Sequence, residues 1–256
     1  MKITTILPIS RKKYLDKIIE SLLSQTYQPD NLIVIYDGVD SDYLEVRNKI
    51  VELPYNVLFM MSNNTGIAHT IHERRQHIVN IHNQFREAIQ DCDWIFSIED
   101  DGVLTNNALE LLLRTAYEEE YNGHRVGMVT GVELGRWGIP YVGAWKVDDV
   151  TNTTEITSLE NMTPKNEHQE IDAFGLYCAL INAEYYKKHH FFTNNGLGPD
   201  VNLGLYLRQQ GFKNYIDWEV PVTHLTLDRN KEIEIPATSE SRVVTLKLLS
   251  GSTWGR

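Results

Sequence analysis

Three consecutive carboxylates, Glu99, Asp100 and Asp101, come directly after the apolar run Trp94–Ile98. Such a run is typical of a buried strand, and open parallel sheets bind their ligands outside the carboxyl ends of the strands. Three anions so close together resist ionisation unless a cation offsets them. Oxygen ligands suit Mg²⁺ or Mn²⁺, which proteins usually hold through one or two carboxylates and the phosphates of a substrate. The pattern therefore indicates a divalent metal ion, with a nucleoside diphosphate as its second partner.

A fourth acid is expected at the same edge of the sheet. Asp37 follows the apolar run 32–36, which is typical of a strand covered on both faces. Because Asp37-Gly38 is also a common turn pair, a turn and a ligand contact are equally good interpretations of this position. No Gly-x-x-x-x-Gly-Lys loop occurs, and no Gly-x-Gly-x-x-Gly turn follows the first strand, so neither an ATPase nor a dinucleotide oxidoreductase is supported. A metal, rather than a glycine-rich loop, would have to hold the pyrophosphate.

Strands and helices that alternate along the chain would position these acids. We expect strands at residues 4–7, 32–36, 57–61, 94–98, 126–131, 173–181 and 215–225. We expect helices from an N-cap at Ser10 to about Gln25, over 78–89 with Ile78 in its buried stripe, over 106–117 and over 200–210. The first strand should stop at Pro8. The alternation predicts an α/β protein with a Rossmann-like, mostly parallel central sheet and helices on both faces.

One segment breaks this alternation. Residues 133–170 are rich in Gly, Trp, Thr and Asn, and a loop this long is usually functional or disordered. Trp137, Tyr141 and Trp145 favour a structured, ligand-facing loop, and aromatic residues that cover a local core are an equally good interpretation.

Bulk properties indicate one globular unit. The 256 residues can bury a single sizeable core. Cys92 and Cys178 lie near apolar runs and are expected to be buried small side chains rather than a disulfide or metal ligands. With 24 basic and 35 acidic residues, the net charge of −11 disfavours duplex nucleic acid as a partner without excluding it. We find no secretory signal and no membrane-spanning run, so we expect a soluble, cytoplasmic protein.

Several short motifs, in their order and spacing, resemble family 2 glycosyltransferases with the GT-A fold. The resemblance covers roughly residues 3 to 226. The segments that carry it are Ile6-Leu7-Pro8 with Arg11 and Tyr14-Leu15, Ser21–Tyr27, Leu32–Gly38, Asn64–Gly66, Glu99–Asp101, Gly198–Asp200 and His224.

The resemblance implies a binding site for the sugar donor. Asp37 would recognise the base or ribose of the donor nucleotide, with the backbone around Pro8 and the side chain of Arg11 nearby. Gly66 and Arg75 are also implied on the donor side.

The resemblance further implies the metal site and the base. Glu99 and Asp101 would be the two acids of the Asp-x-Asp motif, with Asp101 on the metal and Asp100 toward the ribose or sugar. His224 would complete the metal site, which would hold Mn²⁺ or Mg²⁺. Asp200 would be the general base on the acceptor hydroxyl, a role that suits a positioned carboxylate, and the transfer would invert the sugar carbon.

The chain departs from the family pattern at three places. Glu99 stands where Asp is common, and its longer arm could lie outside the first shell of the metal. His82-Asn83 is the best match to an Ala-Arg-Asn stretch, with Arg74, Arg75 and Arg86 nearby, and which of these arginines would contact the diphosphate stays open. Pro199 stands where a Glu usually precedes the base.

These observations favour a metal-dependent inverting glycosyltransferase that uses a nucleotide-diphosphate sugar, with UDP-sugars favoured. Residues 1–226 would form the catalytic domain, with 1–131 on the nucleotide-sugar side, 132–226 on the acceptor side and 227–256 as an extension. Trp137 and Trp145 would contact the acceptor, which could be a glycan, a protein, a small molecule or a modified nucleobase. The alternatives are a sugar-1-phosphate nucleotidyltransferase and a non-catalytic nucleotide-sugar or glycan-binding module.

Overall fold

The computed structural model describes residues 1–65, 68–133, 144–147, 156–158, 167–193, 197–228 and 231–234 of the chain. Within these residues, ten strands form one central sheet. They are β1 (Ile3–Ile9), β2 (Asn31–Tyr36), β3 (Asn56–Met61), β4 (Trp94–Ile98), β5 (Gly102–Leu104), β6 (Val126–Glu133), β9 (His168–Ile171), β11 (Cys178–Asn182), β12 (Lys213–Asp228) and β13 (Lys231–Glu234). The strands of a smaller sheet are β7 (Ala144–Val147), β8 (Ile156–Ser158) and β10 (Ala173–Phe174).

Six α-helices lie in the described parts of the chain. They are α1 (Leu15–Leu23), α2 (Tyr43–Val51), α3 (Ile71–Ala88), α4 (Ala108–Tyr121), α5 (Ala183–Lys188) and α6 (Pro199–Gln209). Two 3-10 turns precede α1 and α2, namely η1 (Lys12–Tyr14) and η2 (Asp40–Asp42). No helix among the described residues is long and apolar enough to cross a membrane.

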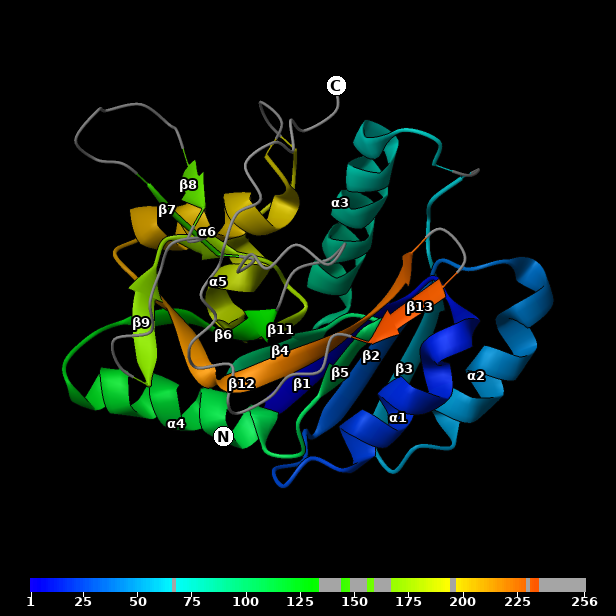
Figure 1. Ribbon diagram of the computed structural model, residues 1–256, viewed down its shortest axis with the longest axis horizontal. Coiled ribbons are helices and arrows are strands. Elements are labelled where there is room, and N and C mark those ends of the chain that lie inside the picture. The colour runs from blue at the N-terminus through cyan, green and yellow to red at the C-terminus, as the bar shows by residue number, and fades with distance from the viewer. Residues whose placement is uncertain are drawn as a thin grey trace.

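The central sheet is mixed but mostly parallel. Its order is β13-β12-β6-β11-β4-β1-β2-β3, with β5 and β9 both paired to β12 (Figure 1). Strand β1 is parallel to β2 and to β4, and β2 is parallel to β3. Strand β11 runs antiparallel to its neighbours β4 and β6. The predicted α/β class with a mostly parallel, helix-covered sheet is therefore confirmed.

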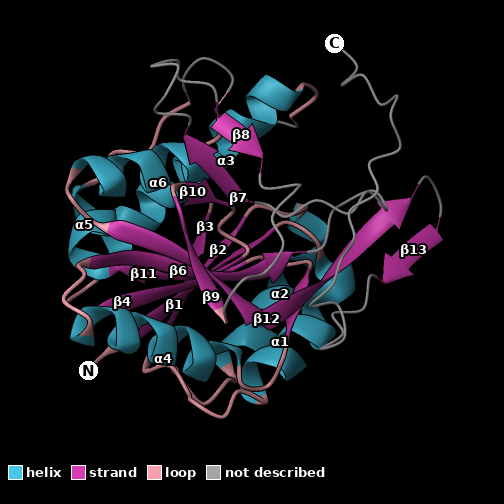
Figure 2. Cartoon of the chain, turned by 60° about the vertical axis from the view of Figure 1, so that its left-hand side comes forward, coloured by secondary structure: helices cyan, strands magenta, loops and turns pink. Residues whose placement is uncertain are grey.

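Helices cover both faces of this sheet, and the strand sequences explain why. In β2, Leu32, Val34 and Tyr36 pack on one face with α1, α2 and α4, whereas Ile33 and Ile35 pack on the other face with α3, α5 and α6. Successive side chains of a strand point to opposite faces, so a strand buried on both sides must be apolar at every position. Figure 2 shows the two groups of helices on opposite sides of the strands.

The first strand does not stop at Pro8, which corrects the prediction. Its pairing with β2 continues until Ile9 lies opposite Tyr36, whereas its pairing with β4 ends at Ile6. Asp37 donates its backbone N–H to the carbonyl of Ile9 at 2.7 Å, so Ile9 faces β2 and Pro8 faces the other way. A proline lacks an N–H donor. Pro8 faces the side of β4, where the pairing has already ended, so no strand hydrogen bond is lost there.

Two helix predictions also need correction. Ser10 is not an N-cap, because the chain first forms η1 and the side chain of Ser10 bonds to Asp100 instead. Helix α1 then ends at Leu23 rather than at about Gln25. Ile78, expected in a buried stripe, is 44% exposed and lines a cavity.

The predicted strand 173–181 is two strands in two sheets. Gly175 separates β10 from β11, and a Cβ at Gly175 would lie 2.6 Å from the ring of Tyr177. The apolar run is thus divided between two sheets, and the approach of the Tyr177 ring leaves no room for a side chain at residue 175.

Two other predictions concern the end of the domain and the cysteines. Strand β12 runs to Asp228 and pairs with β13, and the domain boundary expected at residue 226 stays a prediction. Cys92 and Cys178 are free thiols; Cys178 is buried as expected, whereas Cys92 is only partly buried. Burial raises the pKa of Cys178 to about 12.

Candidate active site

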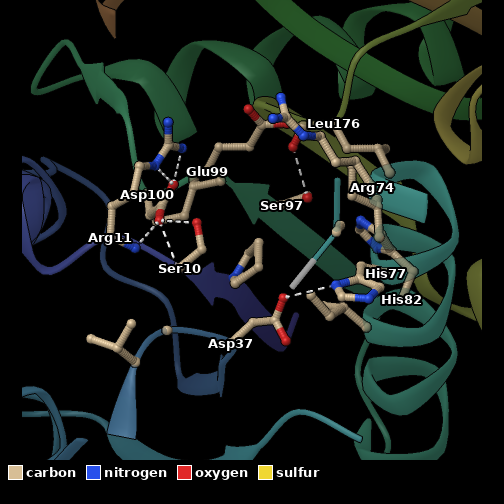
Figure 3. Close-up of a pocket in the computed structure, with 17 residues that line it drawn as sticks. Ser10, Arg11, Asp37, Arg74, His77, His82, Ser97, Glu99, Asp100 and Leu176 are labelled. Carbon is tan, nitrogen blue, oxygen red and sulfur yellow. Dashed lines mark hydrogen bonds and ion pairs between the residues drawn. The ribbon is translucent and has the colours of Figure 1, made fainter. Parts of the chain in front are cut away.

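A cavity of about 530 Å³ opens at the carboxyl ends of β1, β2 and β4 (Figure 3). Helix α3 forms one of its walls. The side chains and backbone that line it belong to Pro8, Ser10, Arg11, Asp37, Gly38, Val39, Ala68, Arg74, His77, Ile78, Ile81, His82, Ser97, Ile98, Glu99, Asp100 and Leu176. Pro8, Arg11, Asp37, Glu99 and Asp100 were all predicted as donor-binding residues, and the structure brings them to this one cavity.

The carboxylate of Asp100 connects the end of β4 to the loop after β1. One oxygen, Oδ2, accepts the backbone N–H groups of Ser10 and Arg11 at 2.7 and 2.8 Å and the Ser10 hydroxyl at 3.0 Å. The other, Oδ1, accepts Nε of Arg11 at 3.1 Å. These bonds occupy both oxygens of a side chain that is only 8% exposed. Asp100 therefore fixes the position of the loop that carries Arg11.

The guanidinium of Arg11 bridges two acids. Its Nη2 contacts Asp100, and its Nη1 lies 2.6 Å from Oδ2 of Asp101. Burial lowers the pKa of Arg11, but the two carboxylates more than offset this effect and raise it. Arg11 therefore remains cationic and neutralises part of the acidic charge at the end of β4.

Strand β12 brings His224 to the same place. Its register relative to β6 shifts between Ile216 and Pro221, and its second half then pairs with β5, with His224 opposite Gly102. In addition, Leu225 donates its backbone N–H to the carbonyl of Asp101 at 2.7 Å. A residue far along the chain is thereby held against the acidic turn that follows β4.

Glu99, Asp101 and His224 form a group that could hold one metal ion. A possible ligand atom of each lies within 4.8 Å of the others, and Nε2 of His224 is 3.3 Å from Oδ1 of Asp101. Asp101 and His224 are each 2% exposed. Two carboxylates and one imidazole are a donor set that fits Mn²⁺, and a cation would also offset the repulsion between the acids. Asp101 and His224, the two predicted metal ligands, thus lie together with Glu99.

Asp37 is anchored from the side of α3. The side-chain amide of Asn64 donates to Oδ1 of Asp37 at 3.0 Å and to the carbonyl of His77 at 3.3 Å. Asn80 in turn donates to the amide oxygen of Asn64 at 2.9 Å. Nδ1 of His77 lies 3.9 Å from Oδ2 of Asp37 (Figure 3). Asp37 thus lies at the same edge as Glu99, as the topology predicted, with one carboxylate oxygen oriented by an amide.

The arginine of α3 at the cavity wall is Arg74 and not Arg75. Residues that line the cavity from α3 recur three and four positions apart, which places them on one face of the helix. Arg74, rather than the predicted Arg75, is thus the described arginine of α3 that lines the cavity.

Sequence reasoning missed Ser10 and His77 as site residues, and it left open which of Arg74, Arg75 and Arg86 contacts the diphosphate. A signal for His77 was present, because Thr70 and Glu73 form a capping box that starts α3. The Thr70 hydroxyl accepts the N–H of Glu73 at 3.1 Å, and the Glu73 carboxylate accepts the N–H of Thr70 at 2.8 Å. The pattern Thr-x-x-Glu predicts a helix start here, seven residues before residue 78.

Comparison of the sequence with known protein families gives a match. A family described as Glycosyl transferase family 2 matches residues 6–188, which is more than half of the chain. The chain belongs to glycosyl transferase family 2. The match includes β1, β2, β4 and the acids at their carboxyl ends.

Individual relatives of this family 2 member are distant. Glycosyltransferase GlyA of Streptococcus pneumoniae serotype 4 is 26% identical over 95 residues, which are 37% of this chain and 13% of that protein. The structure of GalNAc-T7 with UDP, GalNAc and Mn²⁺ superposes with a TM-score of 0.61 at 10% identity, covering 88% of this chain and 44% of that one. Mannosyltransferase PcManGT from Pyrobaculum calidifontis, in complex with GDP-Man and Mn²⁺, gives 0.57 at 14% identity, covering 86% and 56%.

These structural matches show the GT-A fold. The chain spans less than two thirds of the length of each of these three relatives.

The remaining predicted residues of this family 2 chain lie elsewhere or outside the described residues. Asp200 is the second residue of α6, after Pro199, where the helix N-terminus favours a negative charge. It is not among the described residues that line the cavity, so its role as base stays a prediction. Trp145 lies in β7 of the small sheet, opposite Ala173. Gly66 and Trp137 lie outside the described residues.

Proposed function

We propose that this chain is a metal-dependent, inverting glycosyltransferase that moves a sugar from a nucleoside-diphosphate sugar, with a UDP-sugar favoured, to the hydroxyl of an acceptor. One observation carries the proposal. Glu99 lines the cavity at the carboxyl ends of three adjacent parallel strands and also belongs to the potential metal-binding group with Asp101 and His224. A nucleotide-sugar site and a metal site would therefore share one wall.

The cavity has features that suit a nucleotide sugar. Its volume of about 530 Å³ lies within the usual range for small-molecule sites. Asp37 would accept hydrogen bonds from the base or ribose. Arg74 would donate hydrogen bonds to the diphosphate from the wall that α3 forms. The similar structures named above contain UDP in one case and GDP-Man in the other, both with Mn²⁺, which supports a nucleotide sugar as donor.

Glu99, Asp101 and His224 would hold Mn²⁺ or Mg²⁺. When bound, the ion would neutralise the charge that builds up on the leaving diphosphate. Two of these three residues are almost fully buried, and burial strengthens the electrostatic interactions of their side chains.

Asp200 would take the proton of the acceptor. The acceptor oxygen would form its bond to the anomeric carbon as the bond from that carbon to the diphosphate breaks, while the acceptor proton passes to the carboxylate of Asp200. Attack on the face opposite the leaving group inverts the carbon. We place the acceptor on the side of residues 132–226, with Trp137 and Trp145 as contacts. The acceptor could be a glycan, a protein, a small molecule or a modified nucleobase.

A panel of donors tests this proposal. Nucleotide release would be measured from UDP-, GDP-, dTDP- and CMP-sugars with Mn²⁺, with and without a chelator, because slow hydrolysis reveals the donor before the acceptor is known. We expect release from one donor, preferably a UDP-sugar, that stops when the metal is removed. If no donor releases nucleotide and calorimetry also detects no binding of any donor, the proposal is wrong.

Two other outcomes separate the alternatives. Tight nucleotide-sugar binding without hydrolysis or transfer to any acceptor would favour a non-catalytic binding module. Pyrophosphate formed from a nucleoside triphosphate and a sugar 1-phosphate would indicate a nucleotidyltransferase. We expect no pyrophosphate to form, because no glycine-rich loop follows β1.

A further inference from the structure

Arg11 lies between the cavity and the potential metal-binding group. It lines the cavity, and its side chain is 41% exposed, whereas the side chains of Asp100 and Asp101 are 8% and 3% exposed. Its guanidinium is therefore more accessible to a ligand in the cavity than either acid, although Asp100 also lines the cavity. A ligand can thus reach Arg11 without any displacement of the acids.

The carboxylate of Asp101 contacts both Arg11 and His224. Its Oδ2 lies 2.6 Å from Nη1 of Arg11, and its Oδ1 lies 3.3 Å from Nε2 of His224. The same carboxylate supplies a possible ligand atom to the group with Glu99 and His224. A divalent cation in that group would thus be placed next to the positive guanidinium. Since like charges repel strongly where water is excluded, Arg11 and the cation cannot both use Asp101 at full strength.

The loop that carries Arg11 does not depend on the contact with Asp101. Asp100 accepts the backbone N–H groups of both Ser10 and Arg11 at 2.7 and 2.8 Å. The side chain of Arg11 can therefore change its partner while its backbone stays in place. A diphosphate is the partner that suits it, because an arginine fork binds phosphate oxygens through two parallel hydrogen bonds.

We propose that Arg11 is a built-in counter-cation that holds Asp101 until a nucleoside diphosphate arrives, so that the divalent cation and the nucleotide bind cooperatively. In the absence of nucleotide, Arg11 lowers the affinity of the group for the cation. When the diphosphate draws the guanidinium away, the carboxylate becomes available to the cation. By linkage, the cation must raise the affinity for the nucleotide by the same factor. This inference rests on the proposed function, since it needs both a cation and a nucleoside diphosphate at the site.

Calorimetric titration of Mn²⁺ into the protein without nucleotide tests this competition. We expect the substitution Arg11→Met to tighten Mn²⁺ binding about tenfold, because it removes the competing charge and keeps a long apolar side chain. The matched control is Lys12→Met. It removes the same charge from the next residue, but Lys12 pairs with Asp42 and Glu45, away from the metal group. We expect it to change the Mn²⁺ affinity less than about twofold.

The same titration in the presence of UDP or GDP tests the coupling. For each protein, we compare the Mn²⁺ affinity with nucleotide to the Mn²⁺ affinity without it. We expect this ratio to be about tenfold larger in the wild-type protein than in Arg11→Met. A metal that bridges to the diphosphate would couple the two ligands in both proteins, so the difference between the proteins is the part that belongs to Arg11.

A second variant keeps the test valid if Arg11→Met does not fold. Arg11→Lys retains the charge, but its single ammonium cannot bridge Asp100 and Asp101 as the fork does. We expect it to bind Mn²⁺ more tightly than the wild type. If a folded Arg11 variant binds Mn²⁺ no more tightly than the wild type, the inference is wrong and the proposed function stands. If neither Mn²⁺ nor any nucleotide binds to any of these proteins, the proposed function fails as well.

Discussion

Asp100 and Asp101 are neighbours in the sequence, but their side chains have different partners. Both carboxylate oxygens of Asp100 accept hydrogen bonds from Ser10 and Arg11, and these bonds hold the loop between β1 and α1. Asp101 joins the group with Glu99 and His224. We interpret the acidic turn as one structural acid between two acids of the potential metal-binding group.

This difference predicts a separable effect on stability. We expect Asp100→Ala to lower the free energy of unfolding by about 2–3 kcal/mol, because it leaves the N–H groups of Ser10 and Arg11 and a guanidinium without their acceptor. Urea unfolding measures this quantity. Asp16→Ala is the control, since Asp16 is 79% exposed and pairs only at the surface with Lys49, and we expect a change within about 0.5 kcal/mol. Equal stability of both variants would show that Asp100 does not hold the loop.

The sequence predicted which acids meet but not all of their neighbours. Asp37 and Glu99 follow parallel strands, so the topology alone places them at one edge. The inward turn of Asp100 depends on the course of the loop after β1, which no local pattern encodes. The sequence left open which of Arg74, Arg75 and Arg86 reaches the cavity, because that depends on how α3, which starts at Ile71, packs against the sheet.

At the scale of elements, a cluster of titratable groups ties α4 to β9. The carboxylate of Glu119 in α4 bonds to Nδ1 of His124 at 2.7 Å and to Nε2 of His168 in β9 at 2.9 Å. Burial raises the pKa of Glu119, but hydrogen bonds from Tyr215, His168 and His124 outweigh it and lower the pKa to about 2. The folded state therefore stabilises the ionised carboxylate.

The sign of the resulting pH dependence follows from this lowered pKa. The stabilisation is fully present above the pKa of a free Glu and is lost as the pH falls from about 5 toward the folded-state pKa of about 2. We expect the free energy of unfolding to drop by about 2 kcal/mol more in the wild type than in Glu119→Gln over this range. Urea unfolding at several pH values measures it. Glu118→Gln, at a side chain that is 48% exposed, is the control and should keep the wild-type profile. Parallel profiles for the wild type and Glu119→Gln would contradict the assignment.

Three apolar strands were the elements that the sequence predicted best. Strands β2, β3 and β4 are apolar at most positions and lie within a residue of their expected bounds. The sequence analysis did not find α2, because only Val46 and Ile50 of its nine residues are buried, and so few apolar positions give little periodicity. The division of 173–181 into two strands depends on a contact between Gly175 and Tyr177 that periodicity does not report.

At the scale of the whole molecule, one sheet carries both expected halves of the domain. Strand β6 spans the boundary at residue 131, and β11 joins it to β4, so the strands that border the cavity and the later strands belong to a single sheet. The chain carries a net charge of −11, which opposes the approach of an anionic diphosphate. A divalent cation at the end of β4 would supply positive charge where the donor needs it. The central claim is therefore that this end of the sheet binds metal and nucleotide sugar together.

Metal-dependent nucleotide release by Asp101→Asn tests this claim most directly. Its control is Asp93→Asn, which makes the same change just before β4, at the opposite end of the strand, where the Asp93 side chain is 61% exposed. With the donor identified in the panel and with Mn²⁺, we expect Asp101→Asn to lower the rate of release by about 100-fold or more, because a ligand and its charge are lost. Asp93→Asn should retain the wild-type rate. If Asp101→Asn released nucleotide as fast as Asp93→Asn at limiting Mn²⁺, the end of β4 would not be the metal-dependent donor site.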